Sequence, residues 1–374
     1  MALERCLFLL ACLGTAQEAV ATFNPRQYYK NNALCKAVRR GHVEKVVDIN
    51  LKYVDINPNA STTLLMVHGW PSLWSTWSYQ IDAFKNDYHL VVPDLRGFGE
   101  SDHPGNPDSS GTMADLVGDL VCLLEHAKIN SAICMGHDWG SAVCYEAARR
   151  RPDIFQGVVG IVVPYIPAAT HFVPIKNLIS AFPTFNYQLF FDTVPDVAAE
   201  ELGKDVERSI RATLRTVASP PPHDFLKCSE SFLRAWDGIS IPPVPFFSHD
   251  EEKYFIEQYN ISGFRNTLQF YAHANRYQTW KLAHTQGNHT IQQPVLAVYP
   301  TEDPVADWML AAQMLKSAHY LPDLTTSLLP GAHWVHLEHP EKLNEVVRKW
   351  LERTAQPYRS GFVIQHPQKY SDDL

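Results

Sequence analysis

The chain has 374 residues, of which 45% are hydrophobic and 19% are charged, and its formal net charge is −8. This composition is typical of a globular protein with one large apolar core. It excludes a generally basic surface that would neutralise nucleic-acid phosphates, so we expect no nucleic-acid partner. The length would allow two or three domains, although α/β folds of this size often form one unit.

The N-terminus carries a short apolar run, Cys6–Gly14, followed by small residues at 19–21. This pattern resembles a secretory signal peptide over residues 1–21, and the run is too short to span a membrane. Glu4 beside Arg5 weakens the positive segment that such signals carry, so a short amphipathic helix of a cytosolic enzyme is the alternative. The location of the protein, secretory or cytoplasmic, depends on which of the two is correct.

From residue 62 onward, short apolar runs alternate with segments of helical spacing. The runs have the length of strands buried on both faces, at 63–67, 89–92, 132–135 and 157–163. Apolar residues three and four apart predict helices at 114–127 and 141–151. This alternation predicts the α/β class, with a doubly wound and mostly parallel sheet.

The alternation stops between residues 166 and 287, where the chain is rich in Phe, Tyr, Trp and Pro. It returns with a strand at 294–298, another near 327–329, and a final helix at 340–352. We therefore predict a helical lid over the carboxyl ends of the strands, where open α/β sheets bind ligands. The expected divisions are two parts of one core at 22–165 and 288–356, the lid at 166–287 and a C-terminal tail at 357–374. Residues 22–53 match no motif.

The sequence holds seven cysteines, and five would remain after removal of residues 1–21. An odd number without close spacing predicts no disulfide framework. Cys134 and Cys144 lie in the predicted strand and helix, so we expect both to be buried free thiols.

The segment Gly136-His137-Asp138-Trp139-Gly140 lies between a predicted strand and a predicted helix. A nucleophile elbow needs small residues two before and two after the nucleophile, because the sharp turn leaves no room for side chains there. The two glycines meet that demand around Asp138, which we predict to be the nucleophile.

An acid and a histidine follow in the chain order of an α/β hydrolase. Asp303 comes after the strand at 294–298, although Glu302 and Asp307 compete for its role. His333 lies in a loop before the last helix and is preferred to two neighbouring histidines, His336 and His339.

His68-Gly69-Trp70-Pro71 follows the strand that would carry the oxyanion-hole loop. The backbone N–H groups of Trp70 and Trp139 are expected to converge on one developing oxyanion.

An aspartate nucleophile changes the chemistry, because a carboxylate has no proton to lose at neutral pH. It can displace a strained or good leaving group at a saturated carbon and so form an ester of the enzyme. His333, held by Asp303, would then activate the water that attacks this ester. Epoxides and alkyl halides are the two substrate classes that fit. No cofactor is implied, since nucleophile, acid and base are protein groups.

With these motifs the sequence resembles the epoxide hydrolases of the α/β-hydrolase fold, over about residues 54–353. Residues 94–101, Asp-Leu-Arg-Gly-Phe-Gly-Glu-Ser, are similar to the Gly-x-Gly-x-Ser segment of that family. Residues 185–189 and 263–271 resemble the two lid segments that carry its proton-donating tyrosines. The resemblance implies that Tyr187 and Tyr271 protonate the epoxide; nothing else distinguishes them among 16 tyrosines. The expected reaction is hydrolysis of an apolar organic epoxide to a vicinal diol.

Three alternatives remain. A haloalkane dehalogenase would share the elbow and triad, with Trp236 or Trp280 as a second halide donor. A metal hydrolase would use the histidines at 333, 336 and 339, although this spacing drifts around a helix. A ligand receptor could retain the fold without turnover. The oligomeric state and the physiological epoxide are not encoded in any recognisable pattern.

Overall fold

The computed structural model describes residues 23–355. The predicted signal peptide at 1–21 and the predicted tail at 357–374 lie outside these residues. Eight strands form one sheet in the order β1-β2-β4-β3-β5-β6-β7-β8. The strands are β1 Lys30–Arg39, β2 Lys45–Ile56, β3 Thr63–Val67, β4 His89–Pro93, β5 Ala132–His137, β6 Phe155–Ile161, β7 Val295–Pro300 and β8 Leu324–Leu329.

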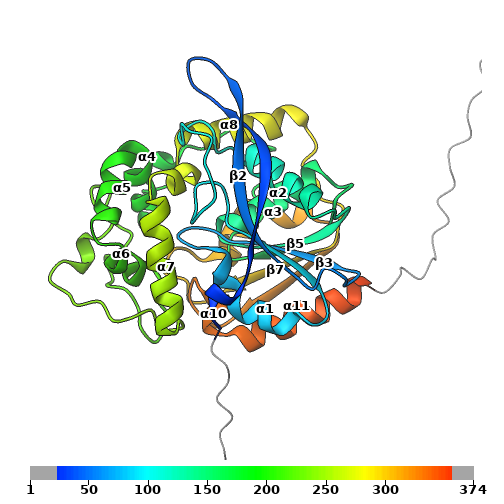
Figure 1. Ribbon diagram of the computed structural model, residues 1–374. Coiled ribbons are helices and arrows are strands. Elements are labelled where there is room, and N and C mark those ends of the chain that lie inside the picture. The colour runs from blue at the N-terminus through cyan, green and yellow to red at the C-terminus, as the bar shows by residue number, and fades with distance from the viewer. Residues whose placement is uncertain (1–22, 356–374) are drawn as a thin grey trace, which may run out of the picture.

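The six strands from β3 to β8 pair in parallel, which confirms the predicted α/β class. Every residue of β3, β4 and β7 is buried, as expected for apolar runs covered on both faces. Helices α1 and α11 pack together below the sheet in Figure 1, and α2 and α3 pack together above it. These helices are α1 Ser78–Phe84, α2 Met113–His126, α3 Trp139–Arg150 and α11 Pro340–Ala355.

The unassigned segment at 22–53 contributes a hairpin to the sheet. β1 and β2 pair antiparallel along ten residues, and β2 continues antiparallel onto β4. In β1 buried and exposed residues alternate, and the buried positions carry only the small side chains of Ala33, Cys35 and Ala37. Such small residues give a weak hydrophobic pattern and explain why β1 was not predicted. In β2, however, Ile49, Leu51 and Tyr53 are buried at alternate positions, a strand signal that the prediction did not use.

Cys134 and Cys144 are buried as expected, but the expectations of free thiols and of no disulfide framework were wrong. Cys134 and Cys144 form a disulfide, and a second disulfide joins Cys35 to Cys122. The first joins β5 to α3, because the elbow folds the helix back along the strand and leaves the two Cα atoms 5.3 Å apart. The second fastens the hairpin to α2 across 87 residues. Neither proximity is visible from spacing, because both depend on the tertiary fold.

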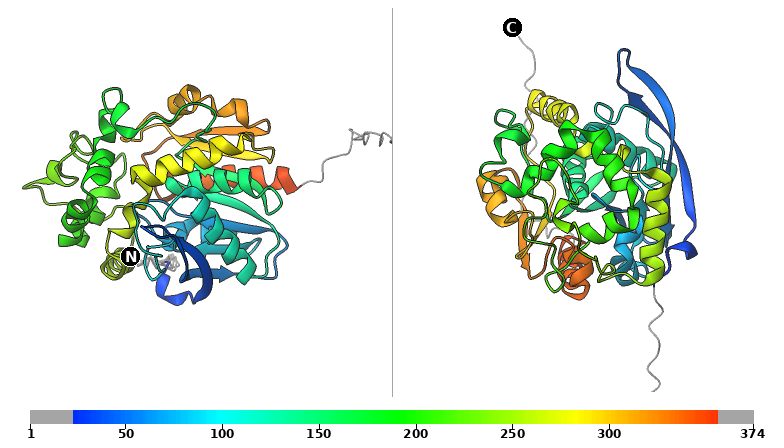
Figure 2. Two further views of the ribbon diagram at one scale, coloured as in Figure 1. Left: turned by 90° about the horizontal axis from the view of Figure 1, so that it is seen from above. Right: turned by 90° about the vertical axis from the view of Figure 1, so that its left-hand side faces the viewer.

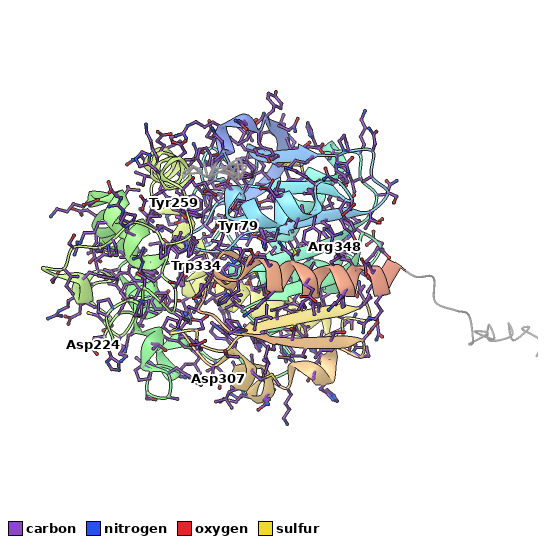
Figure 3. All side chains as sticks on the ribbon, turned by 90° about the horizontal axis from the view of Figure 1, so that it is seen from below. Tyr79, Asp224, Tyr259, Asp307, Trp334 and Arg348 are labelled. Atoms are coloured by element: carbon purple, nitrogen blue, oxygen red, sulfur yellow. A yellow bond between two sulfur atoms is a disulfide. The ribbon has the colours of Figure 1, made fainter. Side chains whose placement is uncertain are left out.

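Helices and loops fill the chain between β6 and β7. Most of them lie together at one end of the sheet, whereas the helix at 273–286 runs back along the core, where it contacts α2 (Figure 2). The longer helices of this region are α4 Asn186–Thr193, α5 Pro195–Lys204, α6 Val206–Thr213, α7 His249–Ser262 and α8 His273–Gln286. Trp334 lies between these helices and the core (Figure 3), and its indole N–H donates to the carbonyl of Thr213 at 3.1 Å. The precise limits of the lid, predicted at 166–287, stay a prediction.

Short helices complete the second part of the core. They are α9 Trp308–Met314 and α10 Val335–Glu338. Among the described residues, no helix has both the length and the apolar character needed to cross a bilayer.

Candidate active site

Asp138 occupies the sharp turn between β5 and α3. Its backbone has φ 54° and ψ −123°, a conformation that residues other than glycine rarely adopt. A Cβ on Gly136 would overlap the carbonyl group of Gly140, and one on Gly140 would overlap the carbonyl oxygen of Val67. The glycines therefore allow the close approach that the strained turn requires, which is the physical demand of a nucleophile elbow.

His333 lies between two carboxylates. Its Nδ1 is 2.8 Å from Oδ2 of Asp303, and its Nε2 is 3.6 Å from Oδ2 of Asp138. The side chain of Asp303 is fully buried, while those of His333 and Asp138 are 12% and 11% exposed. The structure thus brings together the three residues predicted to form the catalytic triad.

The rivals of Asp303 and His333 have other contacts. Glu302 is exposed at the cavity mouth, and Asp307 accepts the amide of Leu310 as the N-cap of α9. The Nε2 atom of His336 lies 3.0 Å from the hydroxyl of Thr76, on the core side of the site. These contacts assign structural positions to Asp307 and His336.

Neighbouring charges shift the pKa values of His333 and Asp138. Burial alone would lower the pKa of His333, but the negative charges of Asp303 and Asp138 outweigh it and raise that pKa to about 10. Burial acts to raise the pKa of Asp138, yet the hydrogen bond and charge of His333 hold it below its ordinary value. The resting arrangement is therefore an imidazolium between two carboxylates.

Of the two amides predicted to form the oxyanion hole, that of Trp70 makes a hydrogen bond to Asp138. The amide N–H of Trp70 donates to Oδ1 of Asp138 at 2.9 Å. Trp139 is the first residue of α3, so its N–H has no acceptor within the helix and is available to a ligand. Trp70 therefore holds Oδ1 of Asp138, whereas Oδ2 is the oxygen that lies 3.6 Å from Nε2 of His333.

Tyr187 and Tyr271 approach the nucleophile from the lid. Tyr187 is on α4 and Tyr271 precedes α8, and their ring centroids are 5.8 Å apart. Both line the cavity that also contains Asp138 and His333. The structure therefore brings the two tyrosines together over the predicted nucleophile.

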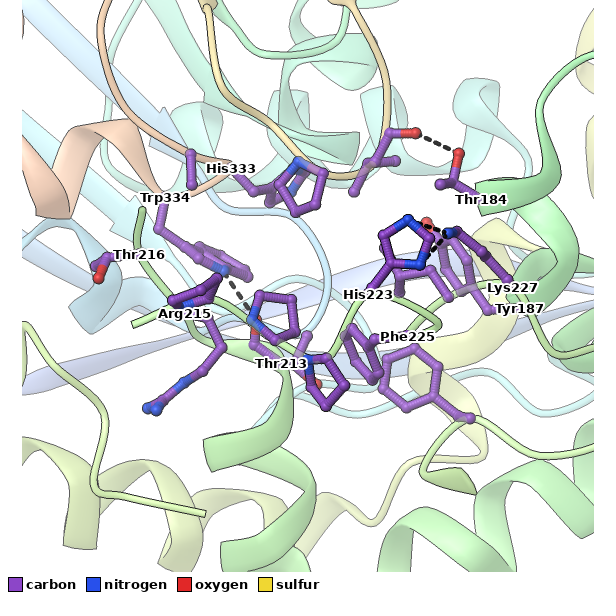
Figure 4. A pocket seen from close by; sticks show the side chains of 18 of the residues that line it. Thr184, Tyr187, Thr213, Arg215, Thr216, His223, Phe225, Lys227, His333 and Trp334 are labelled. Atoms are coloured by element: carbon purple, nitrogen blue, oxygen red, sulfur yellow. Dashed lines mark hydrogen bonds between the residues drawn. The ribbon is translucent and has the colours of Figure 1, made fainter. Parts of the chain in front are cut away.

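The cavity has a volume of about 450 Å³. His333 and Trp334 contribute its core side, and Tyr187 and Phe225 belong to its lid side (Figure 4). Phe232, another lid aromatic, also lines it. Apolar walls with a few polar groups at one point are typical of small-molecule sites.

Sequence reasoning missed several supporting residues. The indole N–H of Trp308 donates to Oδ2 of Asp303 at 2.6 Å, and the amide of Val305 donates to Oδ1 at 2.8 Å. The Nε2 atom of His137 lies 2.8 Å from the carbonyl oxygen of His333. No motif marks Trp308, whereas the place of His137 beside the nucleophile was a signal that could have been used.

The alpha/beta hydrolase fold family model matches residues 62–340. The chain is 26% identical to the bifunctional epoxide hydrolase 2 of Sus scrofa over 327 residues, which cover 85% of this chain and 56% of the pig protein. It is 28% identical to epoxide hydrolase A of Mycobacterium tuberculosis, covering 82% of this chain and 97% of that protein. The chain thus spans little more than half the length of the bifunctional relatives.

Solved structures show the same fold. The crystal structure of epoxide hydrolase A from Mycobacterium thermoresistibile matches with a TM-score of 0.71 at 24% identity, over 85% of this chain and 98% of that one. The expected resemblance to epoxide hydrolases is confirmed by these similarities. Since the family model covers most of the sequence and the sheet and elbow agree with it, the chain belongs to the alpha/beta hydrolase fold family.

Proposed function

We propose that the protein is an epoxide hydrolase that converts an apolar organic epoxide and water into a vicinal diol. One observation carries the proposal: a carboxylate nucleophile, Asp138, faces the same cavity as two lid tyrosines, and His333 lies behind it. The names of the similar proteins from pig and Mycobacterium support the same reaction.

In the first step, Oδ2 of Asp138 attacks one carbon of the epoxide, and the C–O bond to that carbon breaks. The epoxide oxygen takes a proton from Tyr187 or Tyr271, which leaves a tyrosinate. Burial raises the pKa of both tyrosines, so each carries its proton at neutral pH. The product of this step is an ester of Asp138 whose alcohol part carries the new hydroxyl group.

Ester formation changes the charge around His333. Asp138 is then neutral, so one of the two carboxylates that raise the pKa of His333 is lost. The imidazolium gives its proton through solvent to the tyrosinate, which restores the tyrosine. His333 becomes a neutral base at the stage when a base is needed.

In the second step, His333 takes a proton from water, and the hydroxide attacks the carbonyl carbon of the ester. The amides of Trp70 and Trp139 receive the oxyanion. Collapse of this intermediate releases the diol and restores the carboxylate of Asp138 and the imidazolium of His333. Protons therefore balance over the cycle without a cofactor.

The haloalkane dehalogenase alternative lacks its second donor. Neither Trp236 nor Trp280 lines the cavity, and the indole N–H of Trp280 is bound to the carbonyl of Thr170 at 2.7 Å. A departing halide needs N–H donors, whereas an opening epoxide needs the acidic O–H groups that the lid provides.

The decisive experiment measures turnover of purified protein on a panel of one aryl epoxide, one lipid-like epoxide and one haloalkane. We expect diol from at least one epoxide and no halide release, with the activity lost in Asp138→Ala. Diol formation that persists in this variant, or halide release without diol, would overturn the proposal.

A further inference from the structure

Arg276 lies on α8, behind both lid tyrosines. Its Cζ atom is 5.0 Å from the ring centroid of Trp139 and 5.6 Å from that of Tyr271, so the cation packs on two aromatic faces. Its Nε donates to the carbonyl of Phe270 at 2.9 Å, and its Nη2 donates to Oε1 of Gln188 at 2.8 Å. The hydrogen-bond acceptors of this guanidinium are thus neutral groups.

Gln188 connects this cation to the tyrosine beside it. The Nε2 atom of Gln188 donates to the hydroxyl oxygen of Tyr187 at 3.1 Å, and the Gln188 side chain is buried with it. An amide can turn over and present either end, but a guanidinium only donates. Arg276 therefore fixes Oε1 of Gln188 toward itself and the NH2 group toward Tyr187.

This orientation determines what Tyr187 can do. Because its oxygen accepts from Gln188, its own O–H is not used by that contact and can point into the cavity. We propose that Arg276, acting through Gln188, is a positioning residue that directs the hydroxyl proton of Tyr187 toward the epoxide oxygen. This inference rests on the proposed function and extends it to two lid residues that do not take part in the bond changes.

Electrostatics act in the same direction. Burial raises the pKa of Tyr187, and the charge of Asp138 raises it further, whereas the Gln188 hydrogen bond and the charge of Arg276 lower it. Arg276 also opposes the rise in the pKa of Tyr271. The cation thus stabilises the negative charge that either phenol oxygen acquires when it releases its proton.

Gln188→Glu separates positioning from packing. A carboxylate has nearly the same shape and would pair with Arg276, but it only accepts, so the Tyr187 hydroxyl would donate to it instead of to the epoxide. In the His333→Gln background, where ester accumulates, rapid quenching and mass spectrometry give the rate of ester formation. We expect this rate to fall about 100-fold, as for Tyr187→Phe, without a lower Tm.

Arg276→Met tests the cation itself. We expect ester formation to slow about tenfold in the parent and by a clearly smaller factor when Tyr187 is already Phe, because Arg276 then acts only on Tyr271. Lys281→Met removes an exposed cation from the same helix and serves as the matched control, with no expected effect.

Two results would overturn the inference. One is a parental rate of ester formation in Gln188→Glu. The other is that Arg276→Met slows ester formation by the same factor whether residue 187 is Tyr or Phe. Failure of the proposed function is distinguishable, because the parent itself would then form no ester with any epoxide.

Discussion

The active site joins two regions that hold their residues in different ways. In the core, Asp138 directly follows the buried strand β5 and His333 lies in the loop after β8, and their positions follow from the sheet and the elbow. In the lid, Tyr187 and Tyr271 are about 84 residues apart in the chain and meet only because α4 and α8 pack together. The core residues are placed by strands of one hydrogen-bonded sheet, whereas the lid residues are placed by side-chain contacts between helices.

In the proposed cycle the two regions also act on different steps. There the core provides the nucleophile, the base and the oxyanion amides, which are required for forming and hydrolysing the ester. The lid provides protons for ring opening and has no group in contact with His333 during hydrolysis in the proposed cycle. Substitutions in the two regions should therefore separate the two steps, and each prediction below measures that separation.

The largest effect is expected for His333→Gln. The variant keeps the nucleophile and the tyrosines, so it should form the ester but hydrolyse it at least about 10³-fold more slowly. Intact-mass measurement should show an added mass equal to that of the epoxide. Asp138→Ala carries no such adduct and is the control. Turnover with no adduct would mean that water attacks the epoxide directly.

The second prediction concerns the effect of the Asp138 charge on the pKa of His333. Replacing Asp138 by Asn imitates the loss of its charge, so the pKa of His333 should fall from about 10. NMR titration of the imidazole in both proteins measures this change. Folding raises this pKa above its ordinary value of about 6.5, so protonated His333 stabilises the protein fully below that pH.

This stabilisation is lost as the pH rises through about 10. The free energy of unfolding of the parent should therefore fall more steeply with rising pH than that of Asp138→Asn. An unchanged titration of His333 in the variant would contradict the proposed release of its proton on ester formation.

The same contrast explains what the sequence could and could not predict. Continuous apolar runs predicted the strands from β3 to β7, a strand was expected near 327–329 where β8 lies, and the glycines around Asp138 predicted the elbow, because each demand is local in the chain. The strand β1 and both disulfides were missed, since small alternating residues and distant cysteines give no local pattern, whereas the alternating Ile49, Leu51 and Tyr53 of β2 were a local signal that the prediction did not use.

The lid shows this limit most clearly. Tyr187 and Tyr271 were identified only by resemblance, and the contact of Gln188 with Arg276 joins positions 88 residues apart. The sequence around a polar residue on an amphipathic helix does not indicate which distant residue its side chain will contact. The site roles given to these residues stay predictions until they are tested.

The third prediction removes the proton donors of the lid. Tyr187→Phe and Tyr271→Phe should each slow ester formation by about 100-fold, because a positioned general acid contributes about that much. Hydrolysis of the ester, followed in single turnovers, should keep the parental rate. The exposed Tyr29 gives a control substitution to Phe that should change neither step. Equal decreases in the rates of ester formation and ester hydrolysis would show that these tyrosines also affect the geometry of the core residues.

The smallest effect is expected behind the triad, at Trp308. Its indole N–H donates to the same Asp303 oxygen that lies 2.8 Å from His333. Trp308→Phe keeps an aromatic ring but removes that donor, and a hydrogen bond to a charged group contributes about 1.5–3 kcal/mol, so hydrolysis of the ester should slow by about tenfold or more. Ester formation should stay near the parental rate, because Asp138 and the tyrosines are untouched. If Trp308→Phe slowed only ester formation, Trp308 would act in the same step as the lid tyrosines. That result would contradict the assignment of the two steps to the two regions.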